Sequence, residues 1–213
     1  MGGVLLKESH DHFETLLGCQ IEPHLKWHKH VDNLLSRLQQ RLSALENLSS
    51  MVPLGIKRKI VEGIFNSVLI YCLPVFGGCT KGEIDSLQKM QNKAARLVVN
   101  KGWRTPRKEV FAEVGWMTVK QLIVYHTALC TFRIRESKEP EYLHAFMSQT
   151  NRLNRIIIPH TNLSLMRSSY CYRGALEWNN LPDALRSCRS MRKFKSLLKG
   201  WIYENIPQFE ERR

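Results

Sequence analysis

The chain has 213 residues, a hydrophobic content of 43% and a formal net charge of +13 at pH 7. The length suits one domain, or one domain with a small appendage, and the hydrophobic content excludes wholesale disorder. The excess of Lys and Arg lies in residues 26–108 and 185–213, whereas residues 109–184 are nearly neutral. Two basic blocks of this kind favour a polyanionic partner, RNA or DNA, over a surface that is merely soluble.

The cysteines and the longest uncharged run indicate in which cellular compartment the protein is expected. The cysteines form no C-x-x-C pair and mostly have apolar or aromatic neighbours, which is typical of buried free thiols. No secretory signal precedes Lys7 and Glu8, so we expect an intracellular, reducing compartment, nucleus or cytoplasm. The uncharged run from Gly63 to Thr80 is too short for a membrane span. It predicts a buried helix that ends near Pro74, and no membrane partner.

The N-terminal half reads as a short strand followed by helices. Residues 16–23 have the composition of a strand and turn. An apolar stripe with alternating spacings of four and three predicts a helix over 31–48, and a second amphipathic helix follows the next loop. The pattern Thr80-Lys-Gly-Glu83 fits a capping box and predicts the start of a third helix, which ends before Gly102.

The C-terminal half begins with two further helices and then loses the helical pattern. Thr105 as cap, with Pro106 in the first turn, predicts a short helix. A second capping box at Thr118 predicts a longer helix after it. Residues 148–163 read as an extended connection, and the tail from Ser190 is helical again.

These elements predict a mostly α fold, a helical bundle with a short N-terminal strand and an extended connection before a C-terminal helix. We expect three parts. Residues 1–30 form a strand and turn, residues 31–147 a helical domain, and residues 148–213 the connection and a C-terminal helical clasp.

The chain shows no catalytic centre. Polymerases and most nucleases hold catalytic metals with clustered carboxylates, whereas Asp11, Asp32, Asp85 and Asp183 are scattered singly. No P-loop, G-x-S-x-G or H-E-x-x-H pattern is present. We therefore expect a protein that is not an enzyme and uses no cofactor.

The nearest approach to a metal site is His24, His28 and His30, with Cys19 before them. Zinc sites need four well-placed ligands, and the usual pairs are two to five residues apart. His24 and His28 have this spacing, but the predicted strand and turn separate Cys19 from them. Two interpretations stay open, a zinc site or histidines at a basic helix start, and the second is favoured.

The best candidate contact surface is the basic face of the helix that follows Thr80. At 100° per residue its cations fall within about 60° of one another, opposite the apolar face. Cations can neutralise phosphates, and an exposed aromatic in the next loop can stack on a base or ribose. The alternatives are a face that is only solvated, or the second-choice surfaces 57–59 and 186–199. The candidate nucleic-acid-binding residues are Lys89, Lys93, Arg96, Lys101, Trp103, Arg104 and Arg107.

Three separated stretches share their pattern with one known family. Tyr172-Arg-Gly, Trp178-Asn-Asn-Leu-Pro182 and Phe194-Lys match "F-R-G-x-x-x-W-N-x-L-P" and then "F-K-x-x-L-K". Leu17-Gly-Cys-Gln-Ile, Leu25-Lys-Trp27 and His30-Val match "L-G-x-x-I … L-x-W-x-x-H-I/V". Leu87-Gln-Lys-Met-Gln91-Asn-Lys-Ala-Ala-Arg96 matches "L-Q-x-x-Q-N-x-A-x-R". In this order the stretches resemble the C-terminal part of reverse transcriptases from non-LTR retrotransposons, from about Leu16 to Trp201.

The resemblance implies the helical thumb of the polymerase and the connection that follows it. Residues 31–147 would then be thumb-like, and residues 1–30 would be the remnant of the strand next to the palm. In that family the catalytic aspartates lie upstream of the motif at Leu17, so the resemblance implies no catalysis by this chain. It implies binding of template–primer duplex without sequence preference.

A protein-interaction scaffold, or an orphan chain without function, is the rival interpretation. It predicts an exposed apolar surface where a palm would pack, and self-association through that surface. The segment around Trp178 also has two interpretations. Either Trp178 pins the turn while Arg173 stays near the surface, or Arg173 contacts phosphate.

Overall fold

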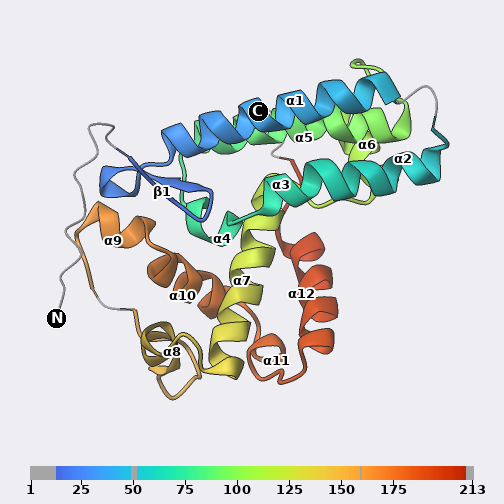
Figure 1. Cartoon of the computed structure of the whole chain (residues 1–213). Helices are drawn as coiled ribbons and strands as arrows, with labels where there is room; N and C mark the ends of the chain where they lie inside the picture. The colour runs from blue at the N-terminus through green and yellow to red at the C-terminus, as the bar shows by residue number, and fades with distance from the viewer. Residues whose placement is uncertain (1–12, 49–51, 159, 210–213) are drawn as a thin grey trace.

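The computed structural model describes residues 13–48, 52–158 and 160–209, and these residues form a mostly helical structure (Figure 1). The predicted fold class is confirmed. One antiparallel hairpin pairs strand β1 (Glu14–Leu16) with β2 (Cys19–Ile21), and a short 3-10 turn, Pro23–Leu25, leads into the helices. The helices are α1 (His28–Leu48), α2 (Leu54–Val61), the π-helical turn η2 (Glu62–Asn66), α3 (Ser67–Ile70), α4 (Leu73–Phe76), α5 (Lys81–Val99), α6 (Arg107–Val114), α7 (Val119–Ser137), α8 (Glu141–Ser148), α9 (Ser164–Ser168), α10 (Tyr170–Asn180), α11 (Asp183–Arg186) and α12 (Met191–Asn205).

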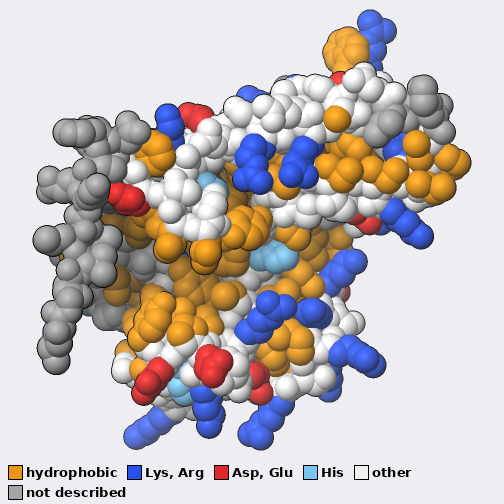
Figure 2. All heavy atoms as spheres, in the orientation of Figure 1, with side chains coloured by type: hydrophobic (Ala, Val, Ile, Leu, Met, Phe, Trp, Pro, Cys, Tyr) orange, Lys and Arg blue, Asp and Glu red, His pale blue; other side chains and the backbone are white. Residues whose placement is uncertain are grey.

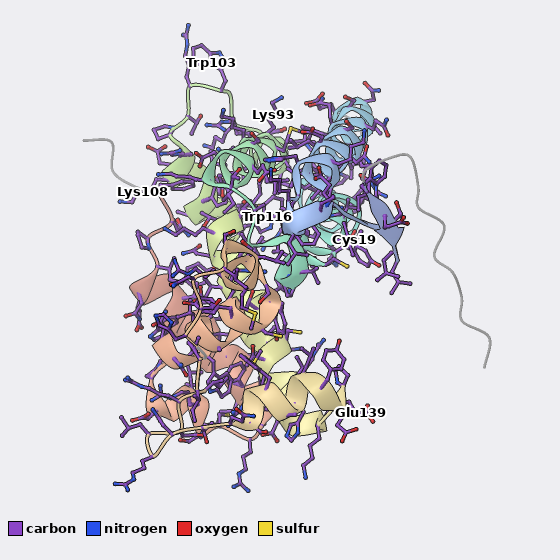
Figure 3. All side chains as sticks on the ribbon, turned by 90° about the vertical axis from the view of Figure 1, so that its left-hand side faces the viewer. Cys19, Lys93, Trp103, Lys108, Trp116 and Glu139 are labelled. Carbon is purple, nitrogen blue, oxygen red and sulfur yellow. The ribbon has the colours of Figure 1, made fainter. Side chains whose placement is uncertain are left out.

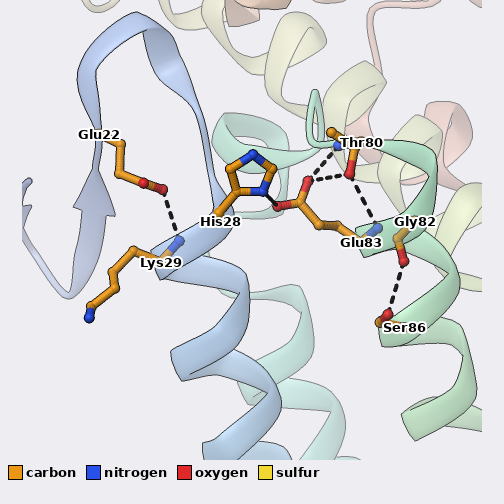
Figure 4. A network of polar contacts seen from close by, with 7 residues as sticks. All are labelled: Glu22, His28, Lys29, Thr80, Gly82, Glu83 and Ser86. Carbon is orange, nitrogen blue, oxygen red and sulfur yellow. Dashed lines mark hydrogen bonds and ion pairs between the residues drawn. The ribbon is translucent and has the colours of Figure 1, made fainter.

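Both predicted capping boxes are present, and one also joins two helices. The Thr80 hydroxyl accepts from the Glu83 backbone N–H, and the Glu83 carboxylate accepts from the Thr80 N–H at 2.6 Å. The same carboxylate lies 2.6 Å from Nδ1 of His28, at the start of α1 (Figure 4). The cap of α5 therefore also fixes where α1 begins relative to it. Thr118 and Gln121 form the second box, at the start of α7.

Two predicted helix boundaries differ in the structure. The cap of α6 is Pro106 and not Thr105, and Pro106 makes no side-chain cap hydrogen bond. The run α2–η2–α3 ends at Ile70, and Pro74 lies inside the separate short helix α4. A left-handed residue, Cys72, separates the two because its φ of 55° cannot continue a helix. Within the described segments no helix is both long enough and apolar enough to cross a bilayer.

The helices pack around two hydrophobic cores, and α7 contributes to both. One core lies among α1, α2, α3, α5 and α6, the helices at the top of Figure 1. The other lies among α7, α8, α10 and α12 below them. Helix α7 packs against α4, α5, α8, α10 and α12. Ile123 belongs to the first core, and Val124, Ala128 and Phe132 belong to the second. One helix thus ties the two cores together.

The segment around Trp178 is helical up to its turn. Glycine and two asparagines lower the helix propensity of this stretch, yet α10 runs to Asn180 because Gly174, Ala175 and Trp178 are buried in the second core. Leu181 and Pro182 then break the helix, as predicted. The Trp178 ring, 1% exposed, stacks on Phe194 of α12 with ring centroids 5.9 Å apart. Trp178 therefore fastens α10 to α12.

Arg173 is partly exposed, so it lies near the surface as expected, but its side chain is bonded within the fold. Its guanidinium is partly buried and donates to three carbonyl oxygens, those of Pro74 at 2.7 Å, Val75 at 3.0 Å and Ser168 at 3.2 Å. The chain around it is close-packed, since a Cβ added at Gly78 would lie 2.8 Å from Arg173 Nε and 2.9 Å from the Ser168 oxygen. Arg173 thus links α10 to α4, and the alternative in which it contacts phosphate is not supported by these bonds.

The two tryptophans Trp178 and Trp103 should differ sharply in their contribution to stability. We expect Trp178→Ala to lower the free energy of unfolding by about 3–5 kcal/mol, because it opens a cavity in the second core. Trp103, which is 79% exposed, is the matched control. Trp103→Ala should change the free energy of unfolding by about 0.5 kcal/mol or less. Urea denaturation of the two variants checks this, and similar losses in both would contradict it.

Candidate nucleic-acid interface

Lys89 and Lys93 lie where the sequence predicts them, on the outer side of α5. The inner side of the helix is buried through Leu87, Met90 and Ala94, and both lysines are exposed. Figure 3 shows Lys93 at the outer edge of the helical layer, while Trp116 lies within the body. The lysines are one turn apart, so they share a face of the helix. No ion pair engages either of them among the residues that the structure describes.

Arg96, the third predicted cation of α5, is structural. Its Nη2 donates to the Thr105 carbonyl at 3.0 Å, and its Nη1 reaches the Asn92 carbonyl at 3.4 Å. The Nε of Arg96 is buried. The side chain therefore braces the loop between α5 and α6 against the last turns of α5, and it is poorly placed to contact a phosphate.

The loop after α5 presents an aromatic–cation pair to solvent. Asn100, with a left-handed φ of 54°, ends α5 and turns the chain outward. Trp103 is largely exposed, and the Arg104 guanidinium lies 5.2 Å from its ring centroid. Figure 3 shows Trp103 at the far tip of this loop, away from the rest of the molecule. Lys101 is exposed as well, 3.8 Å from the Glu113 carboxylate, an ion pair that water screens strongly.

Arg107 packs on the C-terminal segment. Its guanidinium lies 4.6 Å from the ring centroid of Phe209, which in turn meets Phe111 edge-on at 5.1 Å. Sequence reasoning could not find this contact, because Phe209 is far away along the chain and carries no pattern that marks a partner. Arg107 thus holds Phe209, the last described residue, on α6.

The second-choice basic surfaces are only partly available. Lys57 is buried and donates to the Asn100 side-chain oxygen at 3.1 Å, and Arg58 pairs with Glu62 at 2.9 Å. Lys59 is exposed. In the tail, Arg186 is buried and pairs with Asp183. These partners reduce the free charge of surface 57–59, whereas the tail loses only Arg186 and keeps five exposed cations, Arg189, Arg192, Lys193, Lys195 and Lys199. The α5 face differs from the tail by the exposed aromatic ring of Trp103 in its loop.

The histidine and cysteine candidates do not come together as a metal site. His28 is engaged by Glu83, and His30 is buried with its Nε2 3.8 Å from the Cys19 sulfur. Burial, with a contribution from Cys72, raises the pKa of Cys19 to about 12, so this sulfur is a thiol at neutral pH. Within the described residues no three His, Cys, Asp or Glu side chains form a group that could hold a metal ion. The side chain of His24 lies outside the described part.

An apolar surface is exposed around the hairpin and the α3–α4 corner. Leu17, 82% exposed, and its neighbour Leu16 lie at the hairpin turn. The Tyr71 hydroxyl, which follows α3, donates to the Leu17 carbonyl at 2.6 Å, so the turn and the corner are joined. Tyr71 and Val75 are themselves exposed. Figure 2 shows hydrophobic side chains gathered over this region.

Comparison of the chain with protein-family models, with curated proteins and with solved structures finds no match. The likeness to reverse transcriptases therefore stays a prediction that depends on the three sequence motifs alone.

The stability of the protein should fall in mild acid, partly because of His30. Burial, followed by the positive charge of Arg37, lowers the pKa of His30, and its Nδ1 already accepts from the Gln20 N–H at 3.3 Å. Below about pH 6.5 His30 binds a proton in the unfolded chain but remains neutral in the folded protein, because its pKa is lower there. The free energy of unfolding should therefore decrease as the pH falls below that value, by at most about 1.4 kcal/mol per pH unit for one histidine.

Urea denaturation across this pH range measures the effect. His30→Gln keeps an acceptor for the Gln20 N–H but cannot titrate, so its stability should depend less on pH. The exposed His160 provides the control, since His160→Gln should retain the dependence of the unmodified chain. An unchanged slope in His30→Gln would contradict the assignment.

Proposed function

We propose that this protein binds nucleic-acid duplex without sequence preference, through Lys89 and Lys93 of α5 and through Lys101, Trp103 and Arg104 of the loop that follows, and that it has no catalytic activity of its own. The observation that carries the proposal is that these side chains are exposed along α5 and the loop that directly follows it, while Arg96 and Arg107 hold the loop and the C-terminal segment in place. The candidate interface is thus smaller than the predicted set.

The chemistry of this surface suits phosphates better than base edges. Lysine ammonium groups neutralise backbone phosphates and release condensed counterions, which gives affinity without sequence information. Trp103 offers an aromatic face, and stacking of that kind tolerates every base. A helix whose exposed contacts are two lysines has few groups that read base identity. The order of the three family-like motifs supports a thumb-like role with template–primer duplex, derived from the non-catalytic part of a reverse transcriptase.

Charge reversal on this surface tests the proposal. We expect Lys89→Glu, Lys93→Glu and Arg104→Glu combined to abolish binding of a fluorescent RNA–DNA hybrid. On a DNA duplex the log–log salt slope of the unmodified chain should be about −0.9 per phosphate contacted. Each single reversal should reduce its steepness by about 1. Fluorescence anisotropy over a salt series measures both quantities.

The matched control reverses the same number of charges elsewhere. Arg133, Arg152 and Arg155 are exposed and lie outside the α5 surface. Changing these three to Glu should leave most of the affinity, because only the long-range field of the protein changes. If both triple variants lose binding equally, net charge and not this surface is responsible.

The exposed apolar surface around Leu17 and Tyr71 favours a second candidate function, protein interaction through self-association. Apolar side chains that protrude together from a hairpin turn and a helix corner are characteristic of contact sites. This function needs no nucleic acid, and it uses a different surface of the molecule. The two candidates can therefore be separated by variants that touch one surface each.

Self-association should respond to charge placed on the hairpin turn. If this surface forms the contact, sedimentation velocity should show a concentration-dependent oligomer that Leu16→Lys combined with Leu17→Lys dissociates, because lysine ammonium groups cannot be buried unpaired. The exposed Leu153, in the connection after α8, is the control position. A monomer at every concentration, or dissociation by Leu153→Lys as well, would count against this candidate.

A further inference from the structure

A cavity of about 700 Å³ lies beside the Trp178 segment. It is formed where the C-terminal end of α7 meets α10, α11 and the chain that leads into α12. Figure 1 shows these elements together at the lower end of the molecule, opposite the layer that contains α5. The cavity is therefore separate from the surface around Lys89 and Lys93.

The charges that line this cavity are mostly positive. Four cations, Arg135, Lys138, Arg186 and Arg189, are accompanied by a single carboxylate, Glu136. Arg186 is nine-tenths buried and pairs with Asp183 from outside the lining. When the Arg186–Asp183 pair is left out, three cations remain, Arg135, Lys138 and Arg189, against the one carboxylate of Glu136. The C-terminal dipole of α7 opposes an anion by about half a charge, which is less than the excess of full positive charges.

Two of these cations are fixed by the fold. The Arg135 guanidinium lies 5.1 Å from the Trp178 ring centroid, and it donates to the Met147 carbonyl and, at 3.2 Å, to the Asn154 side chain. Arg186 donates to the Asn179 carbonyl at 3.0 Å. The bonds of Arg135 to neutral carbonyl oxygens orient its guanidinium but do not cancel its charge, whereas the charge of Arg186 is balanced by Asp183. Arg135 therefore supplies the fixed positive charge of the cavity.

The other two cations are free to meet a ligand. Lys138 and Arg189 are exposed, and no ion pair or hydrogen bond engages either side chain among the described residues. The donors that these two side chains offer are ammonium and guanidinium N–H groups at the mouth of the cavity. A donor-rich, cationic and polar cavity suits a ligand that brings several negatively charged oxygen atoms.

We propose that this cavity is a phosphate-binding site, in which Lys138 and Arg189 contact the phosphate oxygens and Arg135 supplies fixed positive charge behind them. Phosphate matches because guanidinium and ammonium groups bind it in charge-assisted hydrogen bonds. The phosphate can belong to a small phosphorylated compound or to the backbone of a single strand, and the experiment separates these sources. This site goes beyond the α5 surface and does not depend on it.

Binding to purified full-length chain tests the site with two probes, pyrophosphate and a fluorescent oligothymidylate, at constant ionic strength set with chloride. Lys138→Glu combined with Arg189→Glu should weaken binding at least about tenfold, since two charge-assisted contacts are lost and reversed. Arg192→Glu combined with Lys193→Glu is the matched control, because both residues are exposed in the first turn of α12 and do not line the cavity. It should weaken binding about twofold or less, the effect expected of screened long-range charge.

The outcomes separate the sources and the two proposed sites. If the cavity variant loses pyrophosphate binding and the control variant does not, the cavity is a site for small phosphate compounds. If the cavity variant loses only oligothymidylate binding, the cavity binds the backbone of a strand. Equal effects of the cavity and control variants, or no saturable binding of either probe, would overturn the proposal. Far-ultraviolet circular dichroism checks that the variants fold. If the double variant misfolds, Arg189→Glu alone replaces it in the binding test. Lys89→Glu with Lys93→Glu should leave pyrophosphate binding intact, so failure of one site does not imply failure of the other.

Discussion

The burial of α7 between two hydrophobic cores is the constraint on which the rest of the structure depends. Ile123 packs into the core of α1, α2, α3, α5 and α6, and the next turns pack Ala128 and Phe132 against α10 and α12. Dispersion and apolar burial are short-ranged, so one continuous helix that enters both cores holds them together. The Arg173 bonds to the carbonyls of Pro74 and Val75 add a second link between the same two halves.

The cations of this protein divide into those that the fold engages and those that stay exposed. Guanidinium groups that hold backbone carbonyls, those of Arg96, Arg135, Arg173 and Arg186, are arranged within the fold. Arginine suits this work because its planar fork reaches several acceptors at once. The lysines of the α5 face make no such bonds. An exposed cation adds little to stability, so these lysines are available for a partner, which is the reason for placing the proposed interface there.

The sequence indicated much of the candidate interface, but it could not show which of the predicted cations are exposed and which are bonded within the fold. Helical periodicity was enough to predict that Lys89 and Lys93 share an outer face, because a helix wheel needs only local spacing. It also assigned Arg96 to that face, whereas the structure bonds Arg96 to Thr105 across a turn. The cavity that includes Arg135 and Arg189 had no signal in the sequence, since its lining comes from segments far apart along the chain.

The sequence by itself determined the features that depend on neighbouring residues: the mostly α class, the capping boxes at Thr80 and Thr118, and the break after Asn180. Caps, turn residues and apolar periodicity act over one or two helical turns, so they can be read directly. The tertiary structure alone decided that Arg173 is bonded to α4 and that α10 is helical despite its glycine and asparagines. The Arg173 bonds join segments far apart along the chain, so no local pattern marks them. The helicity of α10 follows from long-range burial, which outweighs local propensity because packing an apolar face contributes more free energy than a few unfavourable residues cost.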